Sequence, residues 1–244
     1  FRRGAALFDT GFHYVGALDE GESLHTLFSY FDLMGLPWKK LDEDCFDEVV
    51  IGEDTYAFAN KHQRFYERMA ARFPKEREGL KKYVTFLKEV GDHIFGVFKG
   101  DEHKRYTYSL LSRSAYEFLN ETIKDPLLRK VLSGTSLKME LNAPTLPLYT
   151  FAQINDSFIR SAWRLRGGGS QIADKLVEGI LSMGGEVKTH AAVTYIKEEN
   201  GKVVGVTVND EDYLETDWIV SNVHPSHTIS LVKDSKALRN IYRN

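Results

Sequence analysis

The chain has 244 residues, of which 42% are hydrophobic and 27% charged, and its formal net charge is −3. These fractions are typical of a folded globular protein and exclude collagen-like, low-complexity and disordered chains. The charge balance indicates no basic surface for nucleic acid, and no apolar run approaches the ~20 residues of a membrane helix. The single cysteine, Cys45, excludes an internal disulfide and a cysteine-rich metal cluster.

Short strands are predicted near the start of the chain. Residues 5–8 are mostly apolar and lead into a turn at 9–11. Apolar and acidic side chains then alternate over 41–59, with turn-forming residues at 52–54. This alternation predicts two short strands joined by a turn.

Helix signals dominate between residues 23 and 134. Leu80, Leu87 and Ile94 recur with the spacing of a buried helical stripe, which makes this the strongest helix in the sequence. Ser114 and Glu117 form a capping box, whose side chains can satisfy free N–H groups at a helix start. Caps and apolar periodicity together predict helices over 24–34 after Ser23, 61–73 after Asn60, 80–94, from 114, and from 126 after Asp125.

The pattern changes after residue 160. The turn at 166–169 ends in Ser170, which is a good cap for a helix that Gly184-Gly185 would end. Asn200-Gly201 is a preferred type I′ hairpin turn, because both of its residues must adopt positive φ. Alternating runs predict strands over 186–189, 193–197, 203–208, 213–217 and 218–220. Helices followed by hairpins indicate an α+β fold.

Aromatic residues are concentrated in the first 120 positions. Phe86 and Phe95 widen the apolar arc of the helix at 80–94, so this helix needs a second contact surface. Another helix, a partner or an apolar tunnel could supply that surface, and we favour a tunnel that leads toward Gly11–Tyr14. Its walls would come from Phe65, Tyr66, Tyr83, Phe86, Phe95, Phe98, Tyr106, Tyr108, Tyr116 and Phe118.

Several catalytic patterns are missing from the sequence. The eight histidines are scattered, and the nearest pair, His224 and His227, has Pro225 between its members, so no metal site is predicted. No serine lies in a G-x-S-x-G motif. The glycine run 167–169 at a helix start could bind an anion or form a tight turn, and the sequence leaves both open.

The order of the remaining motifs resembles a known family. Residues 8–16, FDTGFHYVG, look like the segment that follows the dinucleotide-binding unit in two-domain flavin oxidoreductases. More specifically, the chain resembles the phytoene desaturase, carotenoid isomerase and retinol saturase branch, with monoamine oxidases as more distant relatives. The run 166–170 and the glycines at 184–187 are similar to that family's return to its flavin domain. The series continues in order through 192–196, 201–206 and 217–225.

The resemblance implies a domain organisation. A mainly helical, aromatic-rich substrate-binding domain would occupy 17–160, and portions of an FAD-binding domain would occupy 1–16 and 161–244, the latter as an antiparallel β-rich flank. We expect a fragment of a longer parent, since the family's G-x-G-x-x-G loop and its C-terminal flavin segment are missing from the sequence. The parent would carry FAD, whereas this chain alone is expected to be colourless and inactive.

The resemblance also implies site residues. Gly11, Phe12, His13 and Tyr14 would lie beside the flavin ring, and His13 is the candidate catalytic residue. Val193 would meet the adenine through its backbone, with its side chain packed in a strand that enters the hairpin turn.

The function implied for the parent is that of an FAD-dependent oxidoreductase. It would transfer a hydride between the flavin and a lipophilic substrate such as a polyene, carotenoid or retinoid, by saturation, desaturation or isomerisation. A flavin amine or porphyrinogen oxidase is one alternative, and a binding module for an apolar ligand without redox chemistry is another. We expect a cytoplasmic protein with a lipophilic small-molecule partner, no nucleic acid, and peripheral contact with a membrane.

Overall fold

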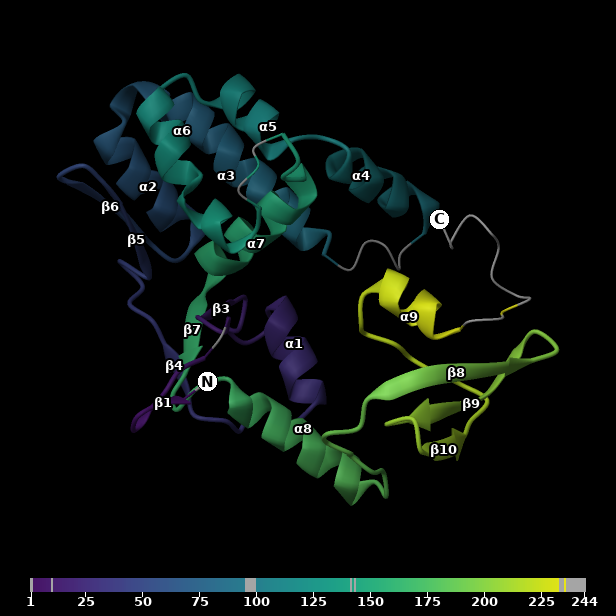
Figure 1. Ribbon diagram of the computed structural model, residues 1–244. Coiled ribbons are helices and arrows are strands. Elements are labelled where there is room, and N and C mark those ends of the chain that lie inside the picture. Colours follow the sequence, from purple (N-terminus) through teal and green to yellow (C-terminus); the bar gives the residue numbers. More distant parts are fainter. Residues whose placement is uncertain are drawn as a thin grey trace. The chain divides into compact units, whose positions relative to one another are not determined.

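The computed structural model describes residues 2–9, 11–94, 100–140, 142, 144–232 and 235 (Figure 1). The chain divides into two compact units, 1–179 and 180–244, and each is described by itself. Among the residues singled out from the sequence, Thr10, Phe95 and Phe98 lie outside the described residues.

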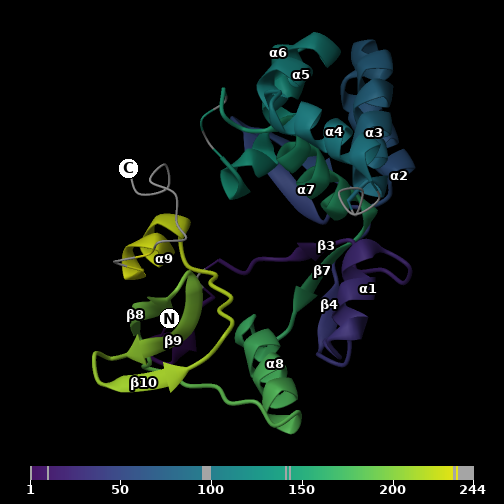
Figure 2. The ribbon, with the colours of Figure 1, turned by 90° about the vertical axis from the view of Figure 1, so that its right-hand side faces the viewer.

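The first unit contains a cluster of helices at one end (Figures 1 and 2). The helix α3 packs against α7 and α2, and the fully buried rings of Phe65, Tyr83 and Phe151 lie in this core. The helices of the cluster are α2 (His62–Arg72), α3 (Arg77–Asp92), α4 (Asp101–Leu111), α5 (Ala115–Thr122), α6 (Pro126–Leu132) and α7 (Leu148–Arg160). Short 3₁₀ turns occur at Pro74–Glu76 and Gly134–Lys138.

Local sequence signals set several helix starts as predicted. The Ser114 hydroxyl accepts the Tyr116 N–H at the start of α5. The Asp125 carboxylate accepts the N–H groups of Leu127 and Leu128 at the start of α6. The apolar stripe of α3 is buried along the helix. The helices predicted from 80, 114 and 126 are therefore confirmed.

Three predicted helix details are wrong. Ser23 does not cap the first helix, because it is itself the first helical residue and the cap position is Glu22. The first helix, α1, covers Ser23–Tyr30 and ends short of residue 34. The reason is that Asp32 adopts positive φ and the Leu33 N–H donates to the Phe28 carbonyl, which closes the helix early. Asn60 does not cap α2: the cap position is Lys61, the Asn60 Nδ2 donates to the Phe158 carbonyl of α7, and the Asn60 Oδ1 accepts no hydrogen bond within the described residues.

Three small antiparallel sheets accompany the helices in the first unit. The predicted hairpin of 41–59 is confirmed. A third sheet includes the end of the motif at 8–16 and has the strand order β3-β7-β4. Its central strand β7 pairs with β3 and β4, which lie far from β7 in the sequence (Figure 2). The strands are β1 (Arg2–Arg3) paired with β2 (Ala6–Leu7), β5 (Asp47–Ile51) paired with β6 (Asp54–Phe58), and β3 (Val15–Gly16), β7 (Ala162–Leu165) and β4 (Trp38–Lys40).

The helix α8 (Ser170–Ser182) begins at the predicted Ser170 and ends before Gly184, which has positive φ. In the second unit, β8 (Val193–Glu199), β9 (Lys202–Val208) and β10 (Asp212–Glu215) form a meander with the order β10-β9-β8, followed by α9 (Pro225–Leu231). Asn200 and Gly201 both have positive φ, so the type I′ turn is confirmed. The strands predicted at 186–189 and 218–220 are wrong, because these exposed segments form no ladder with the meander.

These elements confirm the α+β class. The assignment of 17–160 to substrate and of 1–16 and 161–244 to FAD stays a prediction, and the units divide at 179/180. Among the described residues, no helix combines the length and apolar character needed to cross a bilayer.

Candidate functional site

The motif at 8–16 is held by the start of α8. The Gly169 N–H donates to the Asp9 carboxylate at 2.9 Å. A Cβ on Gly169 would lie 2.8 Å from the Phe12 ring, so only glycine allows this close approach. Gly168 has φ +99° and faces the Asp9 carboxylate. The glycine run is therefore a tight turn, and a carboxylate of the chain itself takes the position that an anion could have used.

Phe12 and His13 line a pocket of about 550 Å³. Gly11 is exposed beside them, and a Cβ there would meet nothing within 4 Å. The rest of the wall comes from β4, β7 and the glycine turn, with Phe8, Lys39, Leu41, Arg164 and Arg166 as its main side chains. A ring-sized, partly polar pocket thus adjoins three of the predicted site residues.

Tyr14 lies next along the chain but lines a different space. A groove of about 350 Å³ runs along β3 and is almost wholly apolar. Leu24 and Leu27 of α1 form one side of it, and Phe158 of α7 contributes to its lining. Phe12 and His13 therefore border a partly polar pocket, and the next residue, Tyr14, borders an apolar groove.

Hydrogen bonds fix the Tyr14 ring. Its hydroxyl donates to Asp47 at 2.5 Å, and the Lys138 ammonium donates to that hydroxyl at 2.6 Å and to Asp47 at 3.0 Å. The ammonium also lies 4.0 Å from the centre of the Tyr14 ring. Burial, followed by the bond to Asp47, raises the pKa of Tyr14, so the phenol keeps its proton. Burial alone would raise the pKa of Asp47, but the bonds from Tyr14 and Lys138 outweigh it and lower that pKa.

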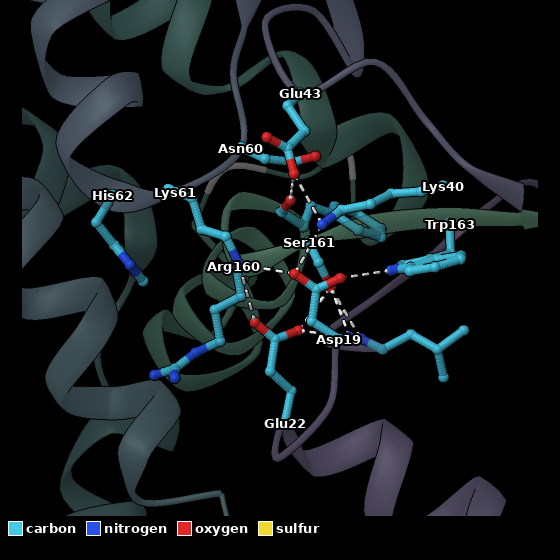
Figure 3. A network of polar contacts seen from close by, with 12 residues as sticks. Asp19, Glu22, Lys40, Glu43, Asn60, Lys61, His62, Arg160, Ser161 and Trp163 are labelled. Carbon is cyan, nitrogen blue, oxygen red and sulfur yellow. Dashed lines mark hydrogen bonds and ion pairs between the residues drawn. The ribbon is translucent and has the colours of Figure 1, made fainter.

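A polar network joins the sheet to the helical cluster (Figure 3). The Asp19 carboxylate accepts Lys40 and Lys61 at 2.8 Å and the Trp163 indole N–H at 3.0 Å. These bonds outweigh the desolvation of Asp19 and lower its pKa. The Ser161 hydroxyl donates to a carboxylate oxygen of Glu22 at 2.5 Å. The network therefore holds β4, β7 and the loop before α1 in register.

The buried carboxylate of Asp156 adds to the contacts between α7 and the neighbouring helices. The side chain of Asp156 is 3% exposed and contacts His62 at 2.7 Å and Arg160 at 2.5 Å. A Cβ on Gly91 would clash with the Asp156 carboxylate, so α3 needs glycine at this crossing. Arg160 also donates to Asp92 at 2.6 Å. These contacts anchor α7, which carries the chain into β7.

The aromatic residues of the helical cluster form a core. Tyr83 stacks on Phe65 and Phe118, and Phe86 packs on Phe118. Tyr108 is 65% exposed. Other helices supply a second contact surface for α3 among the described residues. Phe95 and Phe98, two rings of the predicted tunnel wall, lie outside the described residues, so the tunnel stays a prediction.

The remaining predicted residue, Val193, lies in the second unit. It begins the edge strand β8 and pairs with Val208, and β8 does enter the Asn200-Gly201 turn. Its side chain is 38% exposed, so the prediction that it is packed is wrong. Its role toward an adenine stays a prediction.

Sequence reasoning missed the cations Lys39, Arg164 and Arg166, and the pair Asp47 and Lys138. Cross-strand pairing brings the first three together, and no local motif signals such a pairing. Among the described residues, no group of three metal-ligating side chains occurs.

Comparison with known proteins gives a match over nearly the whole chain. Residues 1–241 match the family described as flavin containing amine oxidoreductase. The chain is 29% identical over 225 residues to all-trans-retinol 13,14-reductase of Danio rerio, covering 82% of this chain and 36% of that protein. It is 25% identical to the chloroplastic prolycopene isomerase of Daucus carota, covering 66% of this chain and 29% of that protein. It is 24% identical to the lycopene-forming phytoene desaturase of a Paracoccus species, covering 72% and 37%. The chain thus spans about a third of the length of these relatives.

Proposed function

The chain belongs to the flavin containing amine oxidoreductase family, and on this premise we propose that it is the substrate-side portion of an FAD-dependent oxidoreductase acting on a lipophilic polyene. The relatives it resembles are named for retinol, prolycopene and phytoene, which are all extended apolar molecules. The observation that carries the proposal is the apolar groove along β3, which begins at Tyr14 beside the motif expected to adjoin the flavin.

The residues present fit only part of FAD. The pocket at Phe12 and His13 offers an aromatic ring, polar groups and open space at Gly11, which suits the edge of a flat heterocycle. The glycine turn does not fit the pyrophosphate, because Asp9 already occupies the N–H of Gly169 and would repel phosphate. We therefore assign to this chain the surroundings of the flavin ring and of the substrate, and assign no phosphate to the glycine turn.

In this proposal the flavin supplies the redox step, and the chain supplies position and a dry surrounding. The groove presents Leu24, Leu27 and Phe158, which bind an apolar chain by removing it from water. Tyr14 forms one wall and is held by Lys138 and Asp47. Its phenol stays neutral, so Tyr14 itself adds no charge to the groove wall.

The amine oxidase alternative is disfavoured by charge. Protonated amines are bound by carboxylates or by the faces of aromatic rings. The pocket at His13 instead carries Lys39, Arg164 and Arg166, and its one acidic side chain, Asp9, is bound to Gly169. A cationic substrate would be repelled there.

The test uses the full-length parent protein. Its visible absorbance should show bound flavin. Anaerobic mixing of the oxidised flavoprotein with phytoene should reduce the flavin and yield a product with more double bonds, or mixing of the dithionite-reduced flavoprotein with all-trans-retinol should oxidise the flavin and yield a product with one double bond fewer. Leu27→Glu, which places a charge in the groove, should raise KM at least tenfold, whereas Tyr108→Glu on exposed α4 should not. A parent without flavin, or one that reacts with amines and not with polyenes, would overturn the proposal.

A further inference from the structure

Two positive side chains face each other across the β4–β7 ladder. Lys39 of β4 is in register with Arg164 of β7. Residues directly opposite in an antiparallel pair point to the same face with their Cβ atoms about 5 Å apart, and like charges in such pairs are destabilising. Both residues are exposed, so water and salt screen the repulsion and its cost in stability is small.

A third cation extends the pair. The Arg166 N–H donates to the Pro37 carbonyl at 3.1 Å, which continues the ladder by one step. Arg166 is two residues beyond Arg164 and so lies on the same face. Within the part of the chain that the structure describes, none of the three cations forms an ion pair, and all three line the pocket at Phe12 and His13.

The neighbouring position on β4 shows the opposite arrangement. Lys40 forms ion pairs with Asp19 and Glu43, both at 2.8 Å, and its ammonium also lies over the ring of Trp163 (Figure 3). One face of the same short ladder is thus neutralised by carboxylates of the protein, and the other is left positive.

We infer that the pocket binds an oxyanion carried on an apolar or aromatic body. Arginine binds carboxylate and phosphate through two parallel hydrogen bonds, and two arginines with one lysine provide the charge. Phe12 and Leu41 provide apolar surface for the body of the ligand. The volume of about 550 Å³ lies in the range of small-molecule sites. Asp9, the one carboxylate on the pocket wall, accepts the Gly169 N–H and balances only part of the charge of the three cations, and the ligand would supply the rest.

This chemistry has two sources, a carboxylate on a lipophilic substrate or the phosphate of a flavin nucleotide. The inference does not depend on turnover, because binding can be measured on this 244-residue chain. Failure of the proposed function in the parent protein would therefore be seen separately from failure of the anion site.

Two matched ligand pairs distinguish the sources. Retinoic acid and retinol differ in a carboxylate, and FMN and riboflavin differ in a phosphate. The quenching of tryptophan fluorescence should show at least tenfold tighter binding of the anion in one pair, and about 1 M salt should weaken it, because the Debye length then falls to about 3 Å. A preference for retinoic acid assigns the substrate, and a preference for FMN assigns the cofactor.

Removal of a pocket cation should weaken anion binding and raise the stability of the ligand-free chain. Lys39→Gln and Arg164→Gln should each weaken binding of the preferred anion about tenfold, yet raise the Tm of the ligand-free chain by up to about 3 °C, because the like-charge contact is relieved. Lys40→Gln, the matched control, should lower the Tm and leave anion affinity unchanged. Equal binding of both members in each pair, or a lower Tm in the two pocket variants, would overturn the inference.

Discussion

Aromatic and charged side chains have different surroundings in the helical cluster and in the three-stranded sheet of the first unit. In the cluster the rings of Tyr83 and Phe151 are fully buried, and the buried carboxylate of Asp156 has two partners. At the sheet Phe12 borders a pocket, and Arg164 on its wall is without an ion pair in the described part of the chain. The difference teaches that abundance of aromatic residues marks the stable core here, whereas uncompensated charge beside open space marks the candidate site.

The largest expected effect is in the core. Phe151→Ala should lower the free energy of unfolding by about 3–5 kcal/mol, because it leaves a cavity in contact with Tyr83. Tyr108→Ala, on the exposed side of α4, should stay within about 0.5 kcal/mol. Urea denaturation measures both. Similar losses in the two variants would mean that the cluster is loosely packed, and the contrast with the sheet would fail.

A smaller effect is expected where β3, at the end of the motif at 8–16, meets α7 of the helical cluster. A Cβ on Gly16 would lie 2.3 Å from the Ser157 backbone of α7, so Gly16→Ala should cost about 1–3 kcal/mol through backbone displacement. A Cβ at Gly11 meets nothing within 4 Å, so Gly11→Ala should leave stability unchanged, while the proposed place of the flavin ring predicts a lower flavin content of the parent protein. Thermal melts and flavin absorbance separate the two effects. A stable Gly16→Ala variant would show that β3 is not held against α7.

Short-range signals were sufficient for much of the fold. Ser114, Asp125 and the Asn200-Gly201 dipeptide each act through hydrogen bonds or φ angles within a few residues, so the sequence alone locates them. The helix α7 was not predicted. Its inward face includes Asn155 and Asp156, and these buried polar residues interrupt the apolar periodicity.

Long-range pairing explains what was missed at the site. Phe12 and His13 could be found because they lie in one motif, and both line the pocket. Lys39 and Arg164 come from strands far apart in sequence, and only the register of β4 with β7 places them together. Thr135, which donates to Asn155, and His62, which contacts Asp156, are also distant from these residues in the chain.

The polar network predicts a pH-dependent effect of intermediate size. The pKa of Asp19 is lowered in the folded chain, so its contribution to stability is present above the unfolded value of about 3.9 and is lost as pH falls through the folded value. Asp19→Asn should cost about 1 kcal/mol at pH 7, and the difference from the wild type should shrink below about pH 3.9.

The matched control is Asp54→Asn, whose more exposed carboxylate pairs with Arg72 and should change stability little at any pH. Denaturant midpoints across the acid range provide the measurement. A constant Asp19→Asn deficit down to pH 2 would show that the carboxylate charge does not hold β4 to β7.

The smallest effect is expected in the second unit, which extends the comparison to the β8–β10 meander. Val193 begins an edge strand and is 38% exposed, so Val193→Ile adds a methylene to a surface that can accept it. Stability should change by less than about 0.5 kcal/mol. Ile196→Val, three residues along the same strand at a buried position, should cost about 0.5–1.5 kcal/mol. If chemical denaturation showed the reverse order, the meander would have to bury the Val193 side chain, and a backbone-only role for that residue would no longer follow.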